Sequence, residues 1–146
     1  MVRRRWLLWL VPGALLAACD SAPTDAPADA VRQRLVGTWL REYDAQGAHV
    51  RRILVLEADG TFREMSSIVT EGAAAKQESQ GAGRWLFDGT NLKRHYASIN
   101  GKPVSAPVVP FATFEISFPS KAEFTGLDRI RRLEVHYERV ADGTEP

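Results

Sequence analysis

Hydrophobic and polar positions alternate along most of the chain from Leu35 onward, in short runs rich in β-branched and aromatic residues. The pattern is clearest at residues 111–118, where Phe114, Ile116 and Phe118 alternate with polar residues. A period of two places one face of a strand in the core and the other in water. No long stretch after Leu35 follows the 3.6-residue period of a helix. The pattern therefore predicts an all-β domain.

Eight such runs are separated by turn signals at nearly regular spacing. The expected strands are residues 35–43, 49–58, 61–70, 81–87, 92–99, 111–118, 121–127 and 131–140. Asp59-Gly60, Asp88-Gly89 and Asn100-Gly101 predict hairpins, because these residue types accept the positive φ of tight turns. Eight short antiparallel strands linked in sequence order can close into an up-and-down barrel. The alternative, a two-sheet sandwich, usually needs Greek-key crossings, so we expect the barrel.

Three further segments complete the body of the chain. Val31 and Leu35 stand four residues apart after Pro27, which predicts a short helical turn over residues 28–35 that caps one end of the domain. Residues 71–79 lack large apolar side chains, so we expect a loop or a helical turn there. Three prolines make residues 102–110 a stiff connection rather than a strand.

The first 18 residues have the anatomy of a signal peptide. Arg3, Arg4 and Arg5 form a positive region, and an apolar run follows from Trp6 to Ala18. A membrane-spanning helix would need about 20 apolar residues, and Pro12-Gly13 interrupts this run. We therefore expect a signal peptide at residues 1–18.

The end of this apolar run resembles a bacterial lipobox, formed by Leu16, Ala17, Ala18 and Cys19. The resemblance implies cleavage before Cys19, whose thiol would carry a diacylglycerol, with further acylation by a chain such as palmitate. Cys19 is the only cysteine, so the mature chain forms no intramolecular disulfide. The expected location is the cell envelope, with the domain in the periplasm and a lipid anchor in a bacterial membrane. Asp20 resembles an inner-membrane retention signal of enteric bacteria, but the choice between inner and outer membrane stays open.

Removal of residues 1–18 takes away three arginines and no acidic residue, which leaves 16 basic and 18 acidic residues and a net charge near −2. With no basic run interleaved with aromatic residues, we expect no nucleic-acid partner. Residues 20–29 are small, acidic and interrupted by proline, which is typical of a mobile tether. The expected organisation is a signal peptide at 1–18, the lipidated cysteine and tether at 19–33, a barrel domain at 34–141 and a polar tail at 142–146.

Gly37-Thr38-Trp39 resembles the G-x-W motif of the lipocalin-like superfamily. Further similarity to small bacterial lipocalin-like lipoproteins lies at residues 56–62 and 83–92. The resemblance covers residues 35–140 and implies a barrel whose closed end is plugged by Trp39. It also implies a basic residue on the last strand that lies across this tryptophan, for which Arg139 is the candidate. Arg131 and Arg132 are alternatives, and the chain differs from larger lipocalins in having no helix after the last strand and no disulfide pair.

The sequence offers little support for catalysis. His49, His95 and His136 lie in three different expected strands without the clustered spacing of a metal site. No motif places a nucleophile beside a base. We therefore expect a protein that is not an enzyme and that uses no metal and no cofactor.

Two functions remain open. In the first, which the resemblance favours, the domain binds or carries a small hydrophobic ligand; in the second, the barrel is solid and contacts an envelope protein. The candidate ligand-lining residues are Trp85, Phe87, Tyr96, Phe114, Ile116 and Phe118, which could equally fill the core. Arg84, Arg94 and Tyr96 could reach the barrel mouth and orient a polar head group, although for Arg84 we favour the alternative of an outer face with paired charges. Residues 71–79 and 102–110 are the candidate lids or contact sites.

Overall fold

The structure is a computed structural model that describes residues 26–105 and 111–146. The predicted signal peptide, the lipobox and Cys19 lie outside the described residues. The helix and strands are α1 (Ala26–Leu35), β1 (Gly37–Ala45), β2 (Ala48–Leu56), β3 (Thr61–Thr70), β4 (Gln77–Phe87), β5 (Asn91–Ile99), β6 (Lys102–Pro103), β7 (Phe111–Ser120), β8 (Glu123–Asp128) and β9 (Leu133–Val140).

Eight of these strands form a closed antiparallel barrel. Neighbouring strands pair in the order β1-β2-β3-β4-β5-β7-β8-β9, and β9 pairs with β1 to close the ring. The two-residue strand β6 is an addition that pairs with the end of β5. The eight-stranded up-and-down barrel expected from the sequence is confirmed, and the sandwich is excluded.

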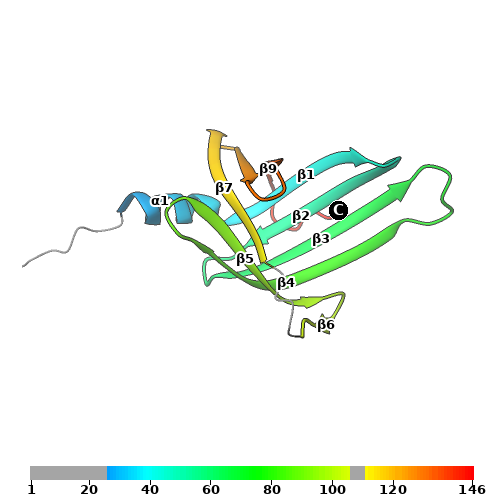
Figure 1. The fold of residues 1–146 in the computed structure, drawn as a ribbon, viewed down its shortest axis with the longest axis horizontal. Coiled ribbons are helices and arrows are strands. Elements are labelled where there is room, and N and C mark those ends of the chain that lie inside the picture. Colours follow the sequence, from blue (N-terminus) through cyan, green and yellow to red (C-terminus); the bar gives the residue numbers. More distant parts are fainter. Residues whose placement is uncertain (1–25, 106–110) are drawn as a thin grey trace, which may run out of the picture.

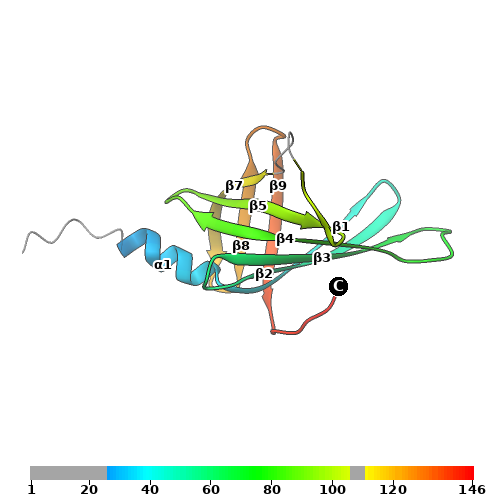
Figure 2. The same cartoon turned by 90° about the horizontal axis from the view of Figure 1, so that it is seen from below.

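The barrel walls have unequal lengths. Figures 1 and 2 show the paired strands β1–β2 and β3–β4 projecting beyond the ring, while β7, β8 and β9 cross them at a steep angle. Accordingly, β1 pairs with all of β2, but with β9 only at Thr38, Trp39 and Leu40. The barrel is therefore tightly closed beside α1 and wide where β1 and β9 diverge.

Strand boundaries lie within two residues of the expected ones except at the start of β4. β4 begins at Gln77, because residues 77–80 continue the ladder with β3, so the expected loop at 71–79 is shortened to 71–76. β9 begins at Leu133 rather than residue 131, because Arg132 has a positive φ of 53° that ends the preceding turn. The strand at 61–70 lies where the pattern predicts it.

All three predicted turns connect strands, but they differ in type. Asn100 and Gly101 both have positive φ, 48° and 74°, as a primed two-residue turn requires. At the other two signals only Gly60 and Gly89 have positive φ, and the connections are longer. Gln46 and Gly47 form another turn with two positive φ angles. The sequence pattern placed a loop there, because Gln-Gly is a weaker signal than Asn-Gly.

The helix α1 is longer than the predicted turn and begins at Ala26. Residues 26–33, which were expected to belong to the tether at 19–33, are therefore helical. Val31 packs against the core and Leu35 is fully buried. Arg32 donates to the carbonyl oxygen of Ala58 at 2.9 Å, and Arg34 donates to that of Ser120. These contacts fix α1 across the closed end of the barrel.

One hydrophobic core occupies the narrow end of the barrel, beside α1. The Trp39 ring meets Phe124 edge-on at 4.7 Å, and Phe124 stacks on Tyr137 at 4.7 Å. Such pairs add to the free energy gained from burial alone. The buried members are Leu35, Trp39, Leu54, Leu56, Phe62, Trp85, Leu92, Phe114, Phe124, Val135 and Tyr137. Leu133, which begins β9 on the same face as Val135 and Tyr137, is 44% exposed.

The last six residues run along the outside of the barrel. Thr38 donates from its hydroxyl to Asp142 Oδ1 at 2.7 Å, and Arg51 Nε donates to the carbonyl oxygen of Glu145 at 3.3 Å. Figure 2 shows this segment leaving β9 and passing beside the long strands. The polar tail expected at 142–146 is thus attached to the outer face of β1 and β2.

Candidate functional site

Trp39 closes the narrow end of the barrel together with Arg139. The guanidinium of Arg139 lies 4.2 Å from the centre of the Trp39 ring, and the two residues are paired across β1 and β9. Trp39 Nε1 donates to the carbonyl oxygen of Leu35 at 2.7 Å. Arg139 donates to the carbonyl oxygens of Val36, at 2.9 Å, and Arg34. The two side chains thus bind the end of α1 to the barrel.

Gly37 allows this arrangement for two reasons: its backbone adopts a positive φ, and its lack of a side chain leaves room for Arg139. Its φ of +133° is one that residues with a Cβ rarely adopt. A Cβ built at this position would lie 2.3 Å from Nη1 of Arg139. Arg131 and Arg132, the alternatives to Arg139, lie in the turn between β8 and β9, where Arg131 pairs with Asp128 at 3.1 Å. The structure therefore places Arg139, and not these two, across Trp39.

The six candidate ligand-lining residues belong to the hydrophobic core or pack directly against it. Trp85 and Phe114 are buried, at 4% and 8% exposure, and the other four are partly buried. Hollows between the described residues lie elsewhere: along the outer side of β3 and β4, beside the turn between β1 and β2, and next to Gly37 and Gly143. None of the six residues lines these hollows. The six aromatic and apolar side chains thus pack within or against the hydrophobic core.

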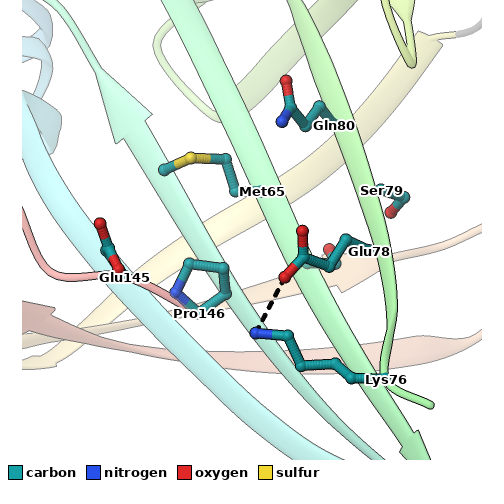
Figure 3. Close-up of a pocket in the computed structure, with 8 residues that line it drawn as sticks. Met65, Lys76, Glu78, Ser79, Gln80, Glu145 and Pro146 are labelled. Carbon is teal, nitrogen blue, oxygen red and sulfur yellow. Dashed lines mark ion pairs between the residues drawn. The ribbon is translucent and has the colours of Figure 1, made fainter.

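One of these hollows, of about 230 Å³, lies between β3, β4 and the end of the tail (Figure 3). Met65 lies between Gln80 and the last two residues, Glu145 and Pro146. Lys76 pairs with Glu78 at 2.9 Å, with both side chains about half exposed. An exposed ion pair of this kind contributes little binding energy, and we assign no ligand to this hollow.

A polar cluster lies inside the barrel, between the hydrophobic core and the projecting strands. The register places Glu64 beside Leu54, which is beside Trp39, so Glu64 points inward. We define the polar cluster as the inward-facing residues Arg52, Glu64, Ser66, Arg94, Tyr96 and Tyr137. They come from β2, β3, β5 and β9. Residues distant in sequence therefore converge at one level of the barrel.

Glu64 is the centre of the polar cluster. Arg94 Nη1 forms an ion pair with Glu64 Oε2, and the Tyr96 hydroxyl donates to the same oxygen at 3.2 Å. Arg52 Nε lies 3.8 Å from Glu64 Oε1 and donates to the Ser66 hydroxyl at 2.9 Å. Two guanidinium groups thus face a single carboxylate, so the polar cluster carries one excess positive charge.

Burial and charge shift the pKa values of the polar cluster. Burial raises the pKa of Glu64, but Arg94 and Arg52 outweigh it and hold the pKa below its ordinary value. Burial also disfavours the charged form of Arg94, but interactions with Tyr137 and Glu64 outweigh it and raise the pKa of Arg94. Burial raises the pKa of Tyr96 to about 12. At neutral pH Glu64 is therefore ionised, both arginines are charged and Tyr96 is protonated.

Two buried atoms of the polar cluster have no hydrogen-bond partner among the described residues: Arg94 Nε and the Tyr137 hydroxyl. Both residues are 2% exposed. Arg94 Nε can only donate, and a tyrosine hydroxyl can donate or accept. Buried polar groups normally have a partner, because leaving one without a partner costs about 1–3 kcal/mol. These two atoms are therefore suited to an acceptor that enters the barrel.

The sequence singled out three residues for the mouth, and the structure separates them. Arg94 and Tyr96 point inward and belong to the polar cluster. Arg84 is exposed and donates to the carbonyl oxygen of Asp59 at 3.3 Å, so it lies on the outer face, which was the preferred alternative for this residue. Sequence reasoning missed Arg52, Glu64 and Tyr137. For Arg52 and Glu64, the sequence did offer a signal, because each is a charged residue at a strand position that faces the interior.

The three histidines lie apart and are exposed. His49 Nδ1 lies 2.9 Å from Asp44, His95 packs against Phe111, and His136 Nε2 lies 3.2 Å from Glu134. Within residues 26–105 and 111–146, no group of three or more potential metal ligands gathers. In the same described ranges, no helix has the length and apolar character to span a membrane.

A search of protein-family models gives no match to this chain, and a search of curated proteins gives none either. The architecture is consistent with the lipocalin-like resemblance, because the barrel has eight antiparallel strands in sequence order. The position of Trp39 at the closed end, under Arg139, adds a local similarity to it.

Proposed function

We propose that this protein is a lipid-anchored lipoprotein of the bacterial cell envelope whose barrel binds a small, mainly hydrophobic ligand. The observation that supports ligand binding is the presence of two buried polar atoms without partners among the described residues, Arg94 Nε and the Tyr137 hydroxyl, in a polar cluster next to the hydrophobic core. The lipobox resemblance at residues 16–19 supports the anchor. The protein has no catalytic role in this proposal.

The ligand binds at the wide end of the barrel, because the narrow end is filled by aromatic side chains. Beyond Arg52 on the inner faces of the projecting strands, the register aligns Tyr43, Val50 and Ile68 in one row. This row is apolar and partly or fully buried. It would receive the hydrophobic body of the ligand, and the polar cluster would receive its polar group.

The anchor is tested by metabolic labelling of the full-length protein with radioactive palmitate in a bacterial host. We expect label and partition into the detergent phase for the native chain and neither for Cys19→Ala. Equal behaviour of both chains would exclude the lipid anchor.

Ligand binding is tested by native mass spectrometry of the full-length protein purified from membranes, followed by organic extraction. We expect a defined hydrophobic adduct that is reduced in Val50→Asp and retained in Val69→Asp. Val69 makes a suitable control because it is 51% exposed on the outer face of β3, next to the inward Ile68. An adduct-free native protein would contradict ligand binding.

The second candidate is an envelope interaction module with a solid barrel. The packing of the six candidate lining residues into the core favours it. Phe111 and Ile130, at 61% and 93% exposure, offer apolar contact points on the surface. An adduct-free protein that loses a cross-linked envelope partner on Ile130→Asp would support this alternative.

A further inference from the structure

We propose that the polar cluster recognises an acidic group on the ligand, of the size and charge of a carboxylate. This inference rests on the proposed ligand-binding function and adds the chemistry of the head group. It comes from three observations: the excess positive charge, the two atoms without partners and the position of the polar cluster beside an apolar row.

The charge of the polar cluster favours an anion over a neutral or cationic group. Arg94 and Arg52 face Glu64 alone, so one positive charge has no counter-charge within the polar cluster. The buried Arg94 forms the closer ion pair with Glu64, which leaves Arg52, whose side chain is 24% exposed, as the guanidinium without a close carboxylate. A charge that is partly removed from water is costly unless it is paired. An entering carboxylate would complete the pairing, whereas an ammonium group would add a second unpaired positive charge.

The atoms without partners favour an acceptor. Arg94 uses Nη1 for Glu64 and leaves Nε without a partner, and the Tyr137 hydroxyl also has none. A carboxylate accepts several hydrogen bonds and donates none when ionised. A carboxylate would therefore supply the kind of acceptor that Nε of Arg94 and the hydroxyl of Tyr137 lack. A buried water molecule is the competing occupant, because water commonly fills such positions.

Access to the polar cluster is through Arg52, whose side chain is 24% exposed while that of Arg94 is 3% exposed. Arg52 lies next to Val50, at the start of the apolar row. A ligand with an acidic head can thus place its head against the guanidinium groups and its body on Tyr43, Val50 and Ile68. The order of polar and apolar positions along the barrel matches an amphipathic molecule.

The test uses the full-length protein in neutral-lipid nanodiscs, with empty nanodiscs as the reference. Three probes of equal chain length are titrated by calorimetry at pH 7: octanoate, octanol and octylamine. We expect octanoate to bind at least about tenfold more tightly than octanol, since a hydrogen bond to a charged group is worth about 1.5–3 kcal/mol. Octylamine should show no binding above the reference.

Two variants locate the head group. Tyr137→Phe removes the hydroxyl and keeps the ring that stacks on Phe124, so octanoate binding should weaken about tenfold while octanol binding is little changed. Glu64→Gln removes the competing carboxylate, so octanoate binding should strengthen about fivefold or more. A purely structural polar cluster would not give this increase. Ser117→Ala, which changes an exposed outer-face hydroxyl, is the matched control.

The outcomes separate the two proposals. Equal binding of octanoate and octanol would leave the ligand-binding function standing and overturn the acidic head group. If Tyr137→Phe preferred octanoate over octanol as strongly as the native chain does, the inference would be overturned as well. The partner of the Tyr137 hydroxyl would then be a water molecule rather than the carboxylate. If no probe binds above the empty nanodiscs, both proposals fail. Should Glu64→Gln not fold, the Tyr137→Phe result decides by itself.

Discussion

At the residue scale, the closed end depends on a few side chains that each make several contacts. Trp39 fills the core with its ring and donates to the end of α1 with its indole nitrogen. Arg139 covers the same ring and donates to two carbonyl oxygens. Because each residue combines packing with hydrogen bonding, even conservative substitutions of Trp39 or Arg139 should lower the free energy of unfolding markedly.

Trp39→Phe should lower the free energy of unfolding by about 2–4 kcal/mol. The variant loses the hydrogen bond to the Leu35 carbonyl oxygen and leaves a gap where the larger ring was. Urea unfolding followed by circular dichroism measures the change. Leu86→Ala is the control, because Leu86 is 52% exposed and should change stability by less than about 0.5 kcal/mol. A similar loss in both variants would contradict the role of Trp39.

Gly37→Ala should destabilise the barrel by about 2–3 kcal/mol, because it combines backbone strain with a close contact to Arg139. Gly72→Ala shares the positive φ, at +78°, but a Cβ there meets no atom within 4 Å. It should therefore cost only about 1 kcal/mol. The difference between the two urea midpoints combines the more strained φ of Gly37 with its contact with Arg139. Equal losses would mean that backbone strain alone explains the need for glycine.

At the element scale, the tail connects the end of β9 back to β1 and β2. Thr38 points to the outer face, opposite Trp39, and is nevertheless only 2% exposed. Its hydroxyl donates to Asp142, so the buried polar group is satisfied by the tail. Arg51 adds a contact to the backbone of Glu145. The tail thus stabilises the strand pair at which the barrel closes.

Asp142→Ala should lower the free energy of unfolding by about 1–3 kcal/mol, since it leaves the buried Thr38 hydroxyl without an acceptor. Glu145→Ala keeps the backbone carbonyl that Arg51 contacts and should have almost no effect. Thermal unfolding compares the two variants with the native chain. Faster hydrogen exchange at the amide of Thr38 is also expected in Asp142→Ala only. Equal melting temperatures in all three chains would exclude a stabilising tail.

At the scale of the whole molecule, the polar cluster couples stability to pH. The folded pKa of Glu64 lies below its ordinary value, because Arg94 and Arg52 outweigh the effect of burial. Its contribution to stability is therefore complete above the unfolded pKa of about 4.3 and is lost as pH falls through the folded pKa. Arg94, Arg52 and Tyr96 are the titratable groups that face it, and the pKa of each lies above its ordinary value. These three groups therefore keep their protonation states across this acidic range.

The native chain should therefore lose stability between about pH 5 and pH 3, and Glu64→Gln should lose less over the same interval. Urea unfolding at pH 7, 5, 4 and 3 measures both curves. Glu115→Gln is the comparison, because Glu115 forms an ion pair with Arg129 at the surface rather than within the barrel. If the slope of the Glu64→Gln curve matched that of the native chain, the pH dependence would have another source.

The barrel and most of its strands could be predicted from the sequence, because alternation with a period of two depends only on which residues seek burial. Trp39 and Phe114 were predicted on buried faces, and both are in the core. The lengths of β4 and α1 were underestimated. Their extra residues are polar or small, and they become ordered through pairing with β3 and contact with the barrel end.

The all-β class and the strand order could be derived from the sequence alone, since they follow from local patterns and from short connections. The plugged end was implied by the lipocalin-like resemblance at Gly37-Thr38-Trp39. Only the tertiary structure decided that Arg52, Glu64, Arg94 and Tyr137 share one level of the interior. Their meeting depends on the register between strands that are far apart in the chain, which no local pattern specifies. The tertiary structure also places the candidate lining residues within or against one hydrophobic core, because such packing depends on how side chains from opposite walls interlock.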